Sequence, residues 1–428
     1  MNINEIDTTT SAALTESLLI ATGGSVRRIT LSNFIHAINA DNLQLMQNVA
    51  WGVTLPADND SSIKLSRLGN QDMMRAYINK IGRYIVTNDG MATKLSYYDS
   101  TILANGDKLD ETTGNVMVIA PQIYFLIRRN ERTCRNELWL SEYPISSNLL
   151  PTLCVGAYKA STDKTYLYSR SGASPIISQP LTTLWNRAQK LGNKWGLIDY
   201  NALRHLQMLF LTCYASRSAQ TAIGYGCCGS TKTNCWQYGV SAHTTGRTAT
   251  LGDQTGKVNF SLDSGGADTC HVSLFGVEDL WGWQWEGIQG IFFASTNNDG
   301  AGTNGYIYQG NRMPTDAELL SQPAGNYSTV KRTAGENFVT KIQAQTQADK
   351  LFNPIATAFG GNSSEYWTDF QTHKLTGQSC YIGGYANDGP HCGIFTMRTD
   401  CEFHFKYTSF GTRLAYYGPL TLIDGAQI

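Results

Sequence analysis

Two segments in the middle of the chain carry apolar side chains at intervals of three and four residues. Residues 181–191 and 203–214 follow this spacing, which places their apolar side chains on one helix face. Pro180 precedes the first segment and Gly192 follows it, while Asp199 can cap the N-terminus of the second. The pattern therefore predicts two helices.

Alternating apolar positions predict antiparallel strands before these helices. They occur at Val116 and Val118, then at Ile123, Phe125 and Ile127, and again at Leu138 and Leu140 after a charged turn. Such alternation indicates β-structure with one buried face. After the helices the chain returns to short strands punctuated by Gly and Asn, with one short helix opened by a capping box from Thr315 to Glu318. We therefore predict an α+β fold.

The first 50 residues are predicted to form a separate small module. The segments "SLLIAT" and "SVRRITL" are typical of two strands joined by a Gly-Gly turn, and a helix is expected from Ser32. A module of this size cannot bury a sizeable core and needs an oligomer or a larger structure to pack against. The chain thus divides into regions 1–50, 51–152 (β-rich) and 153–428.

Three tryptophans alternate in "EDLWGWQWEGI". In an extended segment Trp281, Trp283 and Trp285 would share one face. Such a face could stack on carbohydrate, or it could belong to the core.

Composition narrows the function. Only 16% of the 428 residues are charged and the net charge is −1, so the chain has no basic footprint for nucleic acid. The N-terminus shows no secretion signal, and the longest apolar run is too short for membrane insertion. The ten cysteines form no CxxC pair, which favours free buried thiols in a reducing cytosol.

Motifs for chemistry are weak. Cys270–His271 and His391–Cys392 place soft ligands side by side, but neither has the spacing of a zinc site. The loop 295–305 has the Asn/Asp/Gly character of a calcium loop without the EF-hand spacing, and turn chemistry explains it equally well. No G-x-S-x-G motif or phosphate loop is present. We therefore predict no catalytic residues, no metal ligands and no cofactor, with calcium as an open alternative.

Two C-terminal motifs carry a resemblance. "GVEDLWGWQWEGIQGIFF" at 276–293 and "SFGTRLAYYGPL" at 409–420 resemble the C-type-lectin-like fold of phage receptor-binding tips, diversified adhesins and formylglycine-generating enzymes. "GGYANDGPHCGIF" at 383–395 is similar to the stretch that carries the ligand face in phage members. The resemblance implies a lectin-like domain over 153–428. In this fold Trp281 and Trp285 are expected in the core. Trp283 replaces the usual Asn, and both a core position and a ligand-binding position stay open for it.

Further motifs extend the resemblance to most of the chain. "LSRLGNQDM", "GNVMVIAPQIYFLI", "LWLSEYPI" and "VGAYKAS" resemble, in this order, segments of fibre proteins from phages of gut Bacteroidales, the group that includes the crAss-like phages. "TESLLIATGGSVRRITLSNF" resembles an N-terminal motif of many phage structural proteins. The segments 229–265 and 295–378 are longer than in compact members of the family, so the resemblance assigns no role to them.

The resemblance implies a non-enzymatic virion protein, a tail or head fibre assembled in the bacterial cytoplasm. Region 1–50 would attach to other virion proteins, region 51–152 would form a stalk or collar, and the tip would bind a bacterial surface glycan or protein. A homotrimer is implied as well. The candidate ligand residues are Tyr385, Asn387, Asp388, His391, Phe395, Arg398, His404, Tyr407 and Trp283.

Two alternatives remain open. One is a structural virion decoration protein whose lectin-like domain packs against its neighbours. The other is an oxidase of the formylglycine-generating type, which needs a close cysteine pair and copper. Cys380, Cys392 and Cys401 lie in the corresponding region, but not in the motif of those enzymes.

Overall fold

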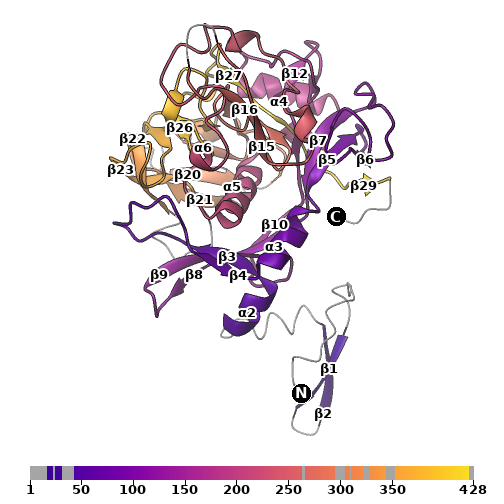
Figure 1. Ribbon diagram of the computed structural model, residues 1–428, viewed down its shortest axis with the longest axis vertical. Helices are drawn as coiled ribbons and strands as arrows, with labels where there is room; N and C mark the ends of the chain where they lie inside the picture. Colours follow the sequence, from indigo (N-terminus) through magenta and orange to yellow (C-terminus); the bar gives the residue numbers. More distant parts are fainter. Residues whose placement is uncertain are drawn as a thin grey trace.

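The architecture is β-rich. The computed structural model describes residues 17–22, 25–30, 43–262, 266–294, 304–308, 310–321, 323, 327–343 and 352–423. Helices make up 15% of the chain and strands 33%, so the fold is mostly β with few helices, in partial agreement with the predicted α+β class (Figure 1). The finer division into three regions stays a prediction.

Two strands near the N-terminus form an antiparallel hairpin. β1 (Ser17–Thr22) and β2 (Ser25–Thr30) pair along their whole length, as predicted. The Gly-Gly turn between them and the helix predicted from Ser32 lie outside the described residues. Helix α2 (Leu43–Val49) follows.

The predicted antiparallel strands are present in a five-stranded sheet. Its spatial order is β10 (Leu149–Leu150), β8 (Ile123–Asn130), β9 (Arg135–Ser141), β3 (Trp51–Thr54) and β4 (Arg67–Gly69). Phe125 pairs with Leu140 across β8 and β9, and Ile127 pairs with Leu138. Along β8, buried and half-buried residues alternate from Ile123 to Arg128, which confirms the predicted buried face.

A seven-stranded sheet combines strands from both sides of residue 152. Its spatial order is β14 (Trp195–Leu197), β28 (Leu414–Tyr416), β11 (Leu153–Gly156), β7 (Asn115–Ala120), β5 (Gly82–Val86), β6 (Met91–Lys94) and β29 (Thr421–Leu422). Every residue of β7 is buried, as its apolar run indicates. Because β7 pairs with β11, the residues before and after 152 share one backbone ladder.

The C-terminal region adds a second seven-stranded sheet. Its spatial order is β23 (Ala356–Phe359), β22 (Gly335–Ile342), β24 (Phe370–His373), β26 (Met397–Thr399), β25 (Tyr381–Ile382), β18 (Trp285–Gly287) and β27 (Phe410–Gly411). Three smaller sheets pair β12 (Ser161–Thr162) with β13 (Leu167–Tyr168), β15 (Gly256–Asn259) with β16 (Cys270–Leu274) and β17 (Val277–Glu278), and β19 (Ile291–Phe293) with β20 (Asn304–Tyr308) and β21 (Tyr327–Lys331).

Both long helices form where the sequence predicts them. α4 (Leu181–Gln189) follows Pro180, and α5 (Tyr200–Tyr214) is capped by Asp199, whose carboxylate accepts the Ala202 N–H at 2.7 Å. The sequence predicts that α5 buries only one face. In the structure the polar residues of its other face are buried as well. In Figure 1 this helix lies among the sheets.

The remaining helices are short. They are α3 (Gln71–Ile78), α6 (Ala219–Ala222) and the 3-10 helices η2 (Val240–Ala242), η3 (Ala249–Leu251), η4 (Glu318–Leu320) and η5 (Gly389–His391). The capping box predicted from Thr315 to Glu318 is present, although the helix it opens is only the 3-10 turn η4. No described helix has the length and hydropathy to cross a membrane.

Glu286 in β18 is a buried carboxylate that contacts two buried cations. It lies 2.6 Å from Lys159 Nζ and 2.7 Å from the Arg413 guanidinium, and these three side chains are at most 1% exposed. Burial alone would raise the pKa of Glu286, but Arg413 and Lys159 outweigh it and hold that pKa below its ordinary value. Arg413 also donates to three backbone carbonyls, which spreads its charge over peptide dipoles. We call these three residues the ionic hub.

Removing the negative charge of the hub is expected to be costly. Glu286→Gln keeps the side-chain shape but leaves two buried cations without a counter-charge, so we expect a loss of about 3 to 5 kcal/mol in unfolding free energy. Urea unfolding measures it. The control is Asp72→Asn, which breaks the exposed ion pair with Arg75 and should leave stability almost unchanged. Equal stability of both variants and the wild type would contradict this role of the hub.

A second buried polar contact involves α5. The Tyr77 hydroxyl donates to the Pro121 carbonyl at 2.6 Å and lies 2.9 Å from His205 Nε2. Because the hydroxyl proton is used on Pro121, His205 must donate from Nε2. Burial lowers the pKa of His205 to about 3, so the ring is neutral in the folded chain at neutral pH.

Stability is therefore expected to depend on pH through His205. Between its ordinary pKa of 6.5 and its folded pKa of about 3, the unfolded chain binds a proton that the folded chain does not, so stability falls as pH falls. At pH 5 this amounts to about 2 kcal/mol. The variant His205→Gln can still donate to Tyr77 but does not titrate. Urea unfolding at pH 7.5 and pH 5 should show a smaller loss for the variant, and identical losses would contradict the assignment.

Candidate functional site

The nine predicted ligand residues differ in exposure. Two are exposed, namely His404 and Tyr407; five are half-buried, namely Tyr385, Asn387, Asp388, His391 and Arg398; and two are buried, namely Phe395 and Trp283. The ring of Phe395 lies 4.9 Å from that of Trp367, and Trp283 Nε1 donates to the Val240 carbonyl at 3.2 Å. Because neither ring reaches the surface, Phe395 and Trp283 are corrected to core residues.

The prediction that the three alternating tryptophans share one face of an extended segment is wrong. Strand β18 begins only at Trp285, because Asp279 and Gly282 adopt positive φ angles of 49° and 85° and turn the backbone before it. Trp281 and Trp285 pack into two different core clusters, which confirms core packing for both. Trp283 joins a third cluster, together with Cys227, Cys235, Val240 and Ala386.

Four of the half-buried ligand residues are held by neighbouring groups. Arg398 pairs with Asp400 at 2.8 Å and lies over the Trp285 ring. Asn387 accepts the Trp236 N–H at 2.8 Å and Asp388 accepts the Tyr385 N–H at 3.0 Å. Burial raises the pKa of Asp388 to about 6. His391 stacks on Phe370, with centroids 4.3 Å apart and the planes almost parallel. These four side chains shape the local surface more than they present free polar groups.

Two pairs of aromatic side chains in this region are accessible to solvent, one pair exposed and the other half-buried. Phe405 and Tyr407 are 37% and 56% exposed and stack with an interplanar angle of 15°. Tyr385 packs edge-on against Trp236 at 6.5 Å, and Tyr407 is close enough to Tyr385 to influence its pKa, which burial and Asp388 raise most. We call Trp236, Tyr385, Phe405 and Tyr407 the aromatic surface.

The backbone under the stacked pair is fixed to the core. The carbonyl of Tyr407 accepts the N–H groups of Ser178 and Phe410, each at 3.1 Å. The carbonyl of Phe405 accepts the hydroxyl of Tyr381 at 3.3 Å. The two rings are therefore presented on an anchored turn, which limits the entropy lost on binding a ligand.

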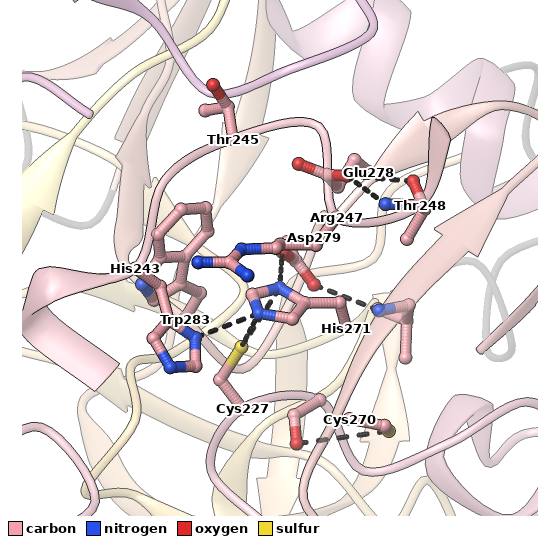
Figure 2. Close-up of polar contacts among 12 residues, drawn as sticks. Cys227, His243, Thr245, Arg247, Thr248, Cys270, His271, Glu278, Asp279 and Trp283 are labelled. Carbon is pink, nitrogen blue, oxygen red and sulfur yellow. Dashed lines mark hydrogen bonds and ion pairs between the residues drawn. The ribbon is translucent and has the colours of Figure 1, made fainter. Parts of the chain in front are cut away.

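A separate group of potential metal ligands lies beside Trp283, two of them buried and one half-buried. Cys227 follows α6, His243 follows η2 and His271 lies on β16. The His243 Nδ1 and His271 Nε2 atoms are 2.9 Å apart, and the Cys227 sulfur lies 3.4 Å from His271 Nδ1 and 3.9 Å from its Nε2. Figure 2 shows these side chains gathered around the His271 ring. We call Cys227, His243 and His271 the Cys-His cluster.

Asp279 orients the central ring of this cluster. One carboxylate oxygen lies 2.6 Å from His271 Nδ1, and the other accepts the Val272 N–H at 2.9 Å. Burial alone would lower the pKa of His271, but Asp279 outweighs it and holds that pKa above its ordinary value. Burial, together with the nearby His271, lowers the pKa of His243 to about 4. Burial and Asp279 raise the pKa of the Cys227 thiol.

Glu278 secures the loop beside the cluster. Its buried carboxylate accepts the N–H and hydroxyl of Thr248 at 2.6 and 2.9 Å (Figure 2). It also accepts the N–H of Gly246 at 2.8 Å. The neighbouring acids Glu278 and Asp279 thus hold different parts of the site, one the loop backbone and the other the imidazole.

The Cys-His cluster is what the sequence reasoning missed. Cys227 and His271 are 44 residues apart, and His243 and His271 are 28 apart, so no local spacing marks them. Cys270 and His271 are adjacent soft ligands in the sequence, yet the Cys270 sulfur contacts the Gly226 carbonyl instead of joining the cluster. Within the described part of the chain, Cys227, His243 and His271 form the one group of three potential metal ligands. The predicted calcium loop lies outside the described residues except for Asn304 and Gly305.

The cysteines considered for oxidase chemistry are buried. Burial raises the pKa of Cys380 and Cys392, and it raises that of Cys401 to about 12. The Cys392 thiol donates to the Tyr385 carbonyl at 3.3 Å, while the Cys401 sulfur contacts Asp400. Without a bound metal, burial disfavours the thiolate form at all three positions.

Comparison with protein-family models gave no match, and neither did comparison with curated proteins.

The assignment of Trp283 to the core leads to a stability prediction. Trp283→Ala leaves a cavity next to Cys227 and Val240 and is expected to cost about 3 to 5 kcal/mol in unfolding free energy. Trp236→Ala, at a half-buried ring packed against the same core cluster, should cost clearly less. Thermal and urea unfolding compare the two variants. A Trp283→Ala protein with wild-type stability and impaired ligand binding would restore Trp283 as a ligand residue.

Proposed function

We propose that the chain is a phage virion fibre protein whose C-terminal region binds a receptor on the bacterial surface. The support from the sequence is the ordered set of motifs that resemble phage fibre proteins and the C-type-lectin-like fold. The support from the structure is that the motif segments 276–293 and 409–420 meet in the core, where Glu286 contacts Arg413.

The aromatic surface is the observation that carries the proposal. Phe405 and Tyr407 expose large rings on an anchored turn, at the C-terminal segment expected to face the ligand. Aromatic rings of this kind give contact area at low entropy cost and bind the apolar faces of sugar rings. A surface glycan is therefore the receptor class that we favour over protein.

The other parts of the proposal follow from the resemblance. Region 1–50 joins the fibre to other virion proteins, and the β1–β2 hairpin is too small to own a core and needs such a partner. Three copies in a homotrimer would combine weak single contacts into tight attachment. The site of action is then the assembled virion, on its tail or its head.

We expect the double variant Phe405→Ala/Tyr407→Ala to bind host cells at least about 30-fold more weakly, which corresponds to a hot spot of about 2 kcal/mol. Binding of labelled full-length protein is measured on a panel of gut Bacteroidales strains, with and without periodate oxidation of their surface sugars. The full chain is required because the sheet that contains β7 and β11 spans residue 152.

The matched control is Tyr98→Ala, which removes an exposed tyrosine from the middle region. It should bind like the wild type. Loss of binding after periodate identifies glycan, and its persistence identifies a protein receptor. Wild-type protein that binds no strain, including the host of its own phage, would overturn the proposal in favour of a structural role. Equal binding by the double variant would place the receptor site elsewhere.

A further inference from the structure

The receptor-binding proposal makes no use of the Cys-His cluster. Cys227 and His271 are buried, whereas His243 is half-buried, so the cluster meets solvent only at the His243 side. Three different loops and strands supply the three side chains, and Figure 2 shows them directed at one another. A thiol and two imidazoles are rarely found together in a protein core. Apolar side chains would fill the same space without adding buried polar groups that need hydrogen-bond partners.

The spacing of the donor atoms is close to that of a tetrahedral zinc site. With Zn–N of about 2.0 to 2.1 Å and Zn–S of about 2.3 Å, the donor atoms of such a site lie about 3.3 to 3.6 Å apart. Here the His243 Nδ1 to His271 Nε2 distance is 2.9 Å and the Cys227 sulfur to His271 Nε2 distance is 3.9 Å. A bound cation would move the two rings slightly apart and draw the sulfur inward by rotation of the Cys227 side chain.

The surroundings of His271 also resemble those of a metal ligand. Metal-binding histidines commonly donate their second ring N–H to a carboxylate, which fixes the tautomer. Asp279 takes this position at His271 Nδ1, so that Nε2 is left to face His243. Three charged groups act on His271. Asp279 and Glu278 favour a positive charge at this ring, and Arg247 opposes it.

We propose that Cys227, His243 and His271 bind a divalent transition-metal ion of the zinc class. Thiolate and imidazole suit zinc, whereas calcium and magnesium prefer oxygen ligands. On binding, the Cys227 thiol proton passes to solvent as the sulfur–metal bond forms. The proton shared by His243 Nδ1 and His271 Nε2 moves through solvent to His243 Nε2, so that both imidazoles bind the metal as neutral ligands. A water molecule at the His243 side would complete four-fold coordination.

The role of this ion is structural. Between Cys227 and Leu262 the chain has η2, η3 and β15 as its regular elements, so few backbone ladders hold this long segment. A link from Cys227 and His243 to His271 on β16 ties the segment to a strand and removes loop freedom from the unfolded chain. The segment also carries Trp236 of the aromatic surface.

The test is metal analysis of the full-length protein, purified without chelator, loaded with zinc chloride and dialysed. Mass spectrometry of the metal should find about one zinc per chain, against less than about a tenth in Cys227→Ser and His243→Gln. Two controls should keep the zinc. Cys134→Ser removes an exposed thiol and His404→Gln removes an exposed imidazole.

A second readout does not depend on the folding of the variants. Wild-type protein loaded with cobalt(II) should show the thiolate-to-cobalt charge-transfer band of a cysteine-ligated tetrahedral ion, and added zinc should raise the unfolding temperature of chelator-treated protein. Wild-type protein that retains no zinc and gives no charge-transfer band overturns the proposal. So does zinc that is lost from Cys134→Ser but not from Cys227→Ser, which would be adventitious binding at an exposed thiol.

Discussion

The contact of Glu286 with Lys159 and Arg413 is the interaction on which the fold depends. It brings together a strand of the C-terminal sheet, the chain just after β11 and the residue that leads into β28. Such a buried arrangement is stable only when every charge and donor is paired. Arg413 meets this condition with three further carbonyls and Lys159 with the Gln284 carbonyl. The two sequence motifs that resemble the lectin-like fold therefore meet at one carboxylate, and Glu286 and Arg413 serve structure rather than ligand binding.

The parts of the fold set by local pattern could be predicted from the sequence. Strands β8 and β9 follow from alternation, α5 follows from its cap at Asp199, and the β1–β2 hairpin follows from its two short apolar runs. Where a non-glycine residue takes a positive φ angle, the pattern misleads. Asp279 does so at 49°, and with Gly282 it sends the three tryptophans into separate clusters. The sheet that joins β7 to β11 could not be predicted either, because no local sequence pattern identifies which strands pair.

The candidate sites were predictable to different degrees. Exposure of Tyr407 and His404 agrees with a position on an outer turn, but alternation could not separate them from the buried Phe395. The Cys-His cluster could not be found from spacing, because its members are brought together by tertiary packing over 44 residues. The two sites are physically connected. The segment after Cys227 supplies Trp236 to the aromatic surface, Asn387 accepts the Trp236 N–H, and Trp283 packs between the segment and His271. Order in the cluster therefore supports the position of one wall of the aromatic surface.

The central claim, that this chain attaches a virion to its host through the aromatic surface, is tested most directly by competition for adsorption. Host cells are first saturated with purified full-length protein, and the adsorption rate of phage particles that carry the chain is then measured. Our account predicts slower adsorption in proportion to the cell sites occupied, with no effect from protein that lacks the Phe405 and Tyr407 rings. Unchanged adsorption at saturating wild-type protein would contradict it.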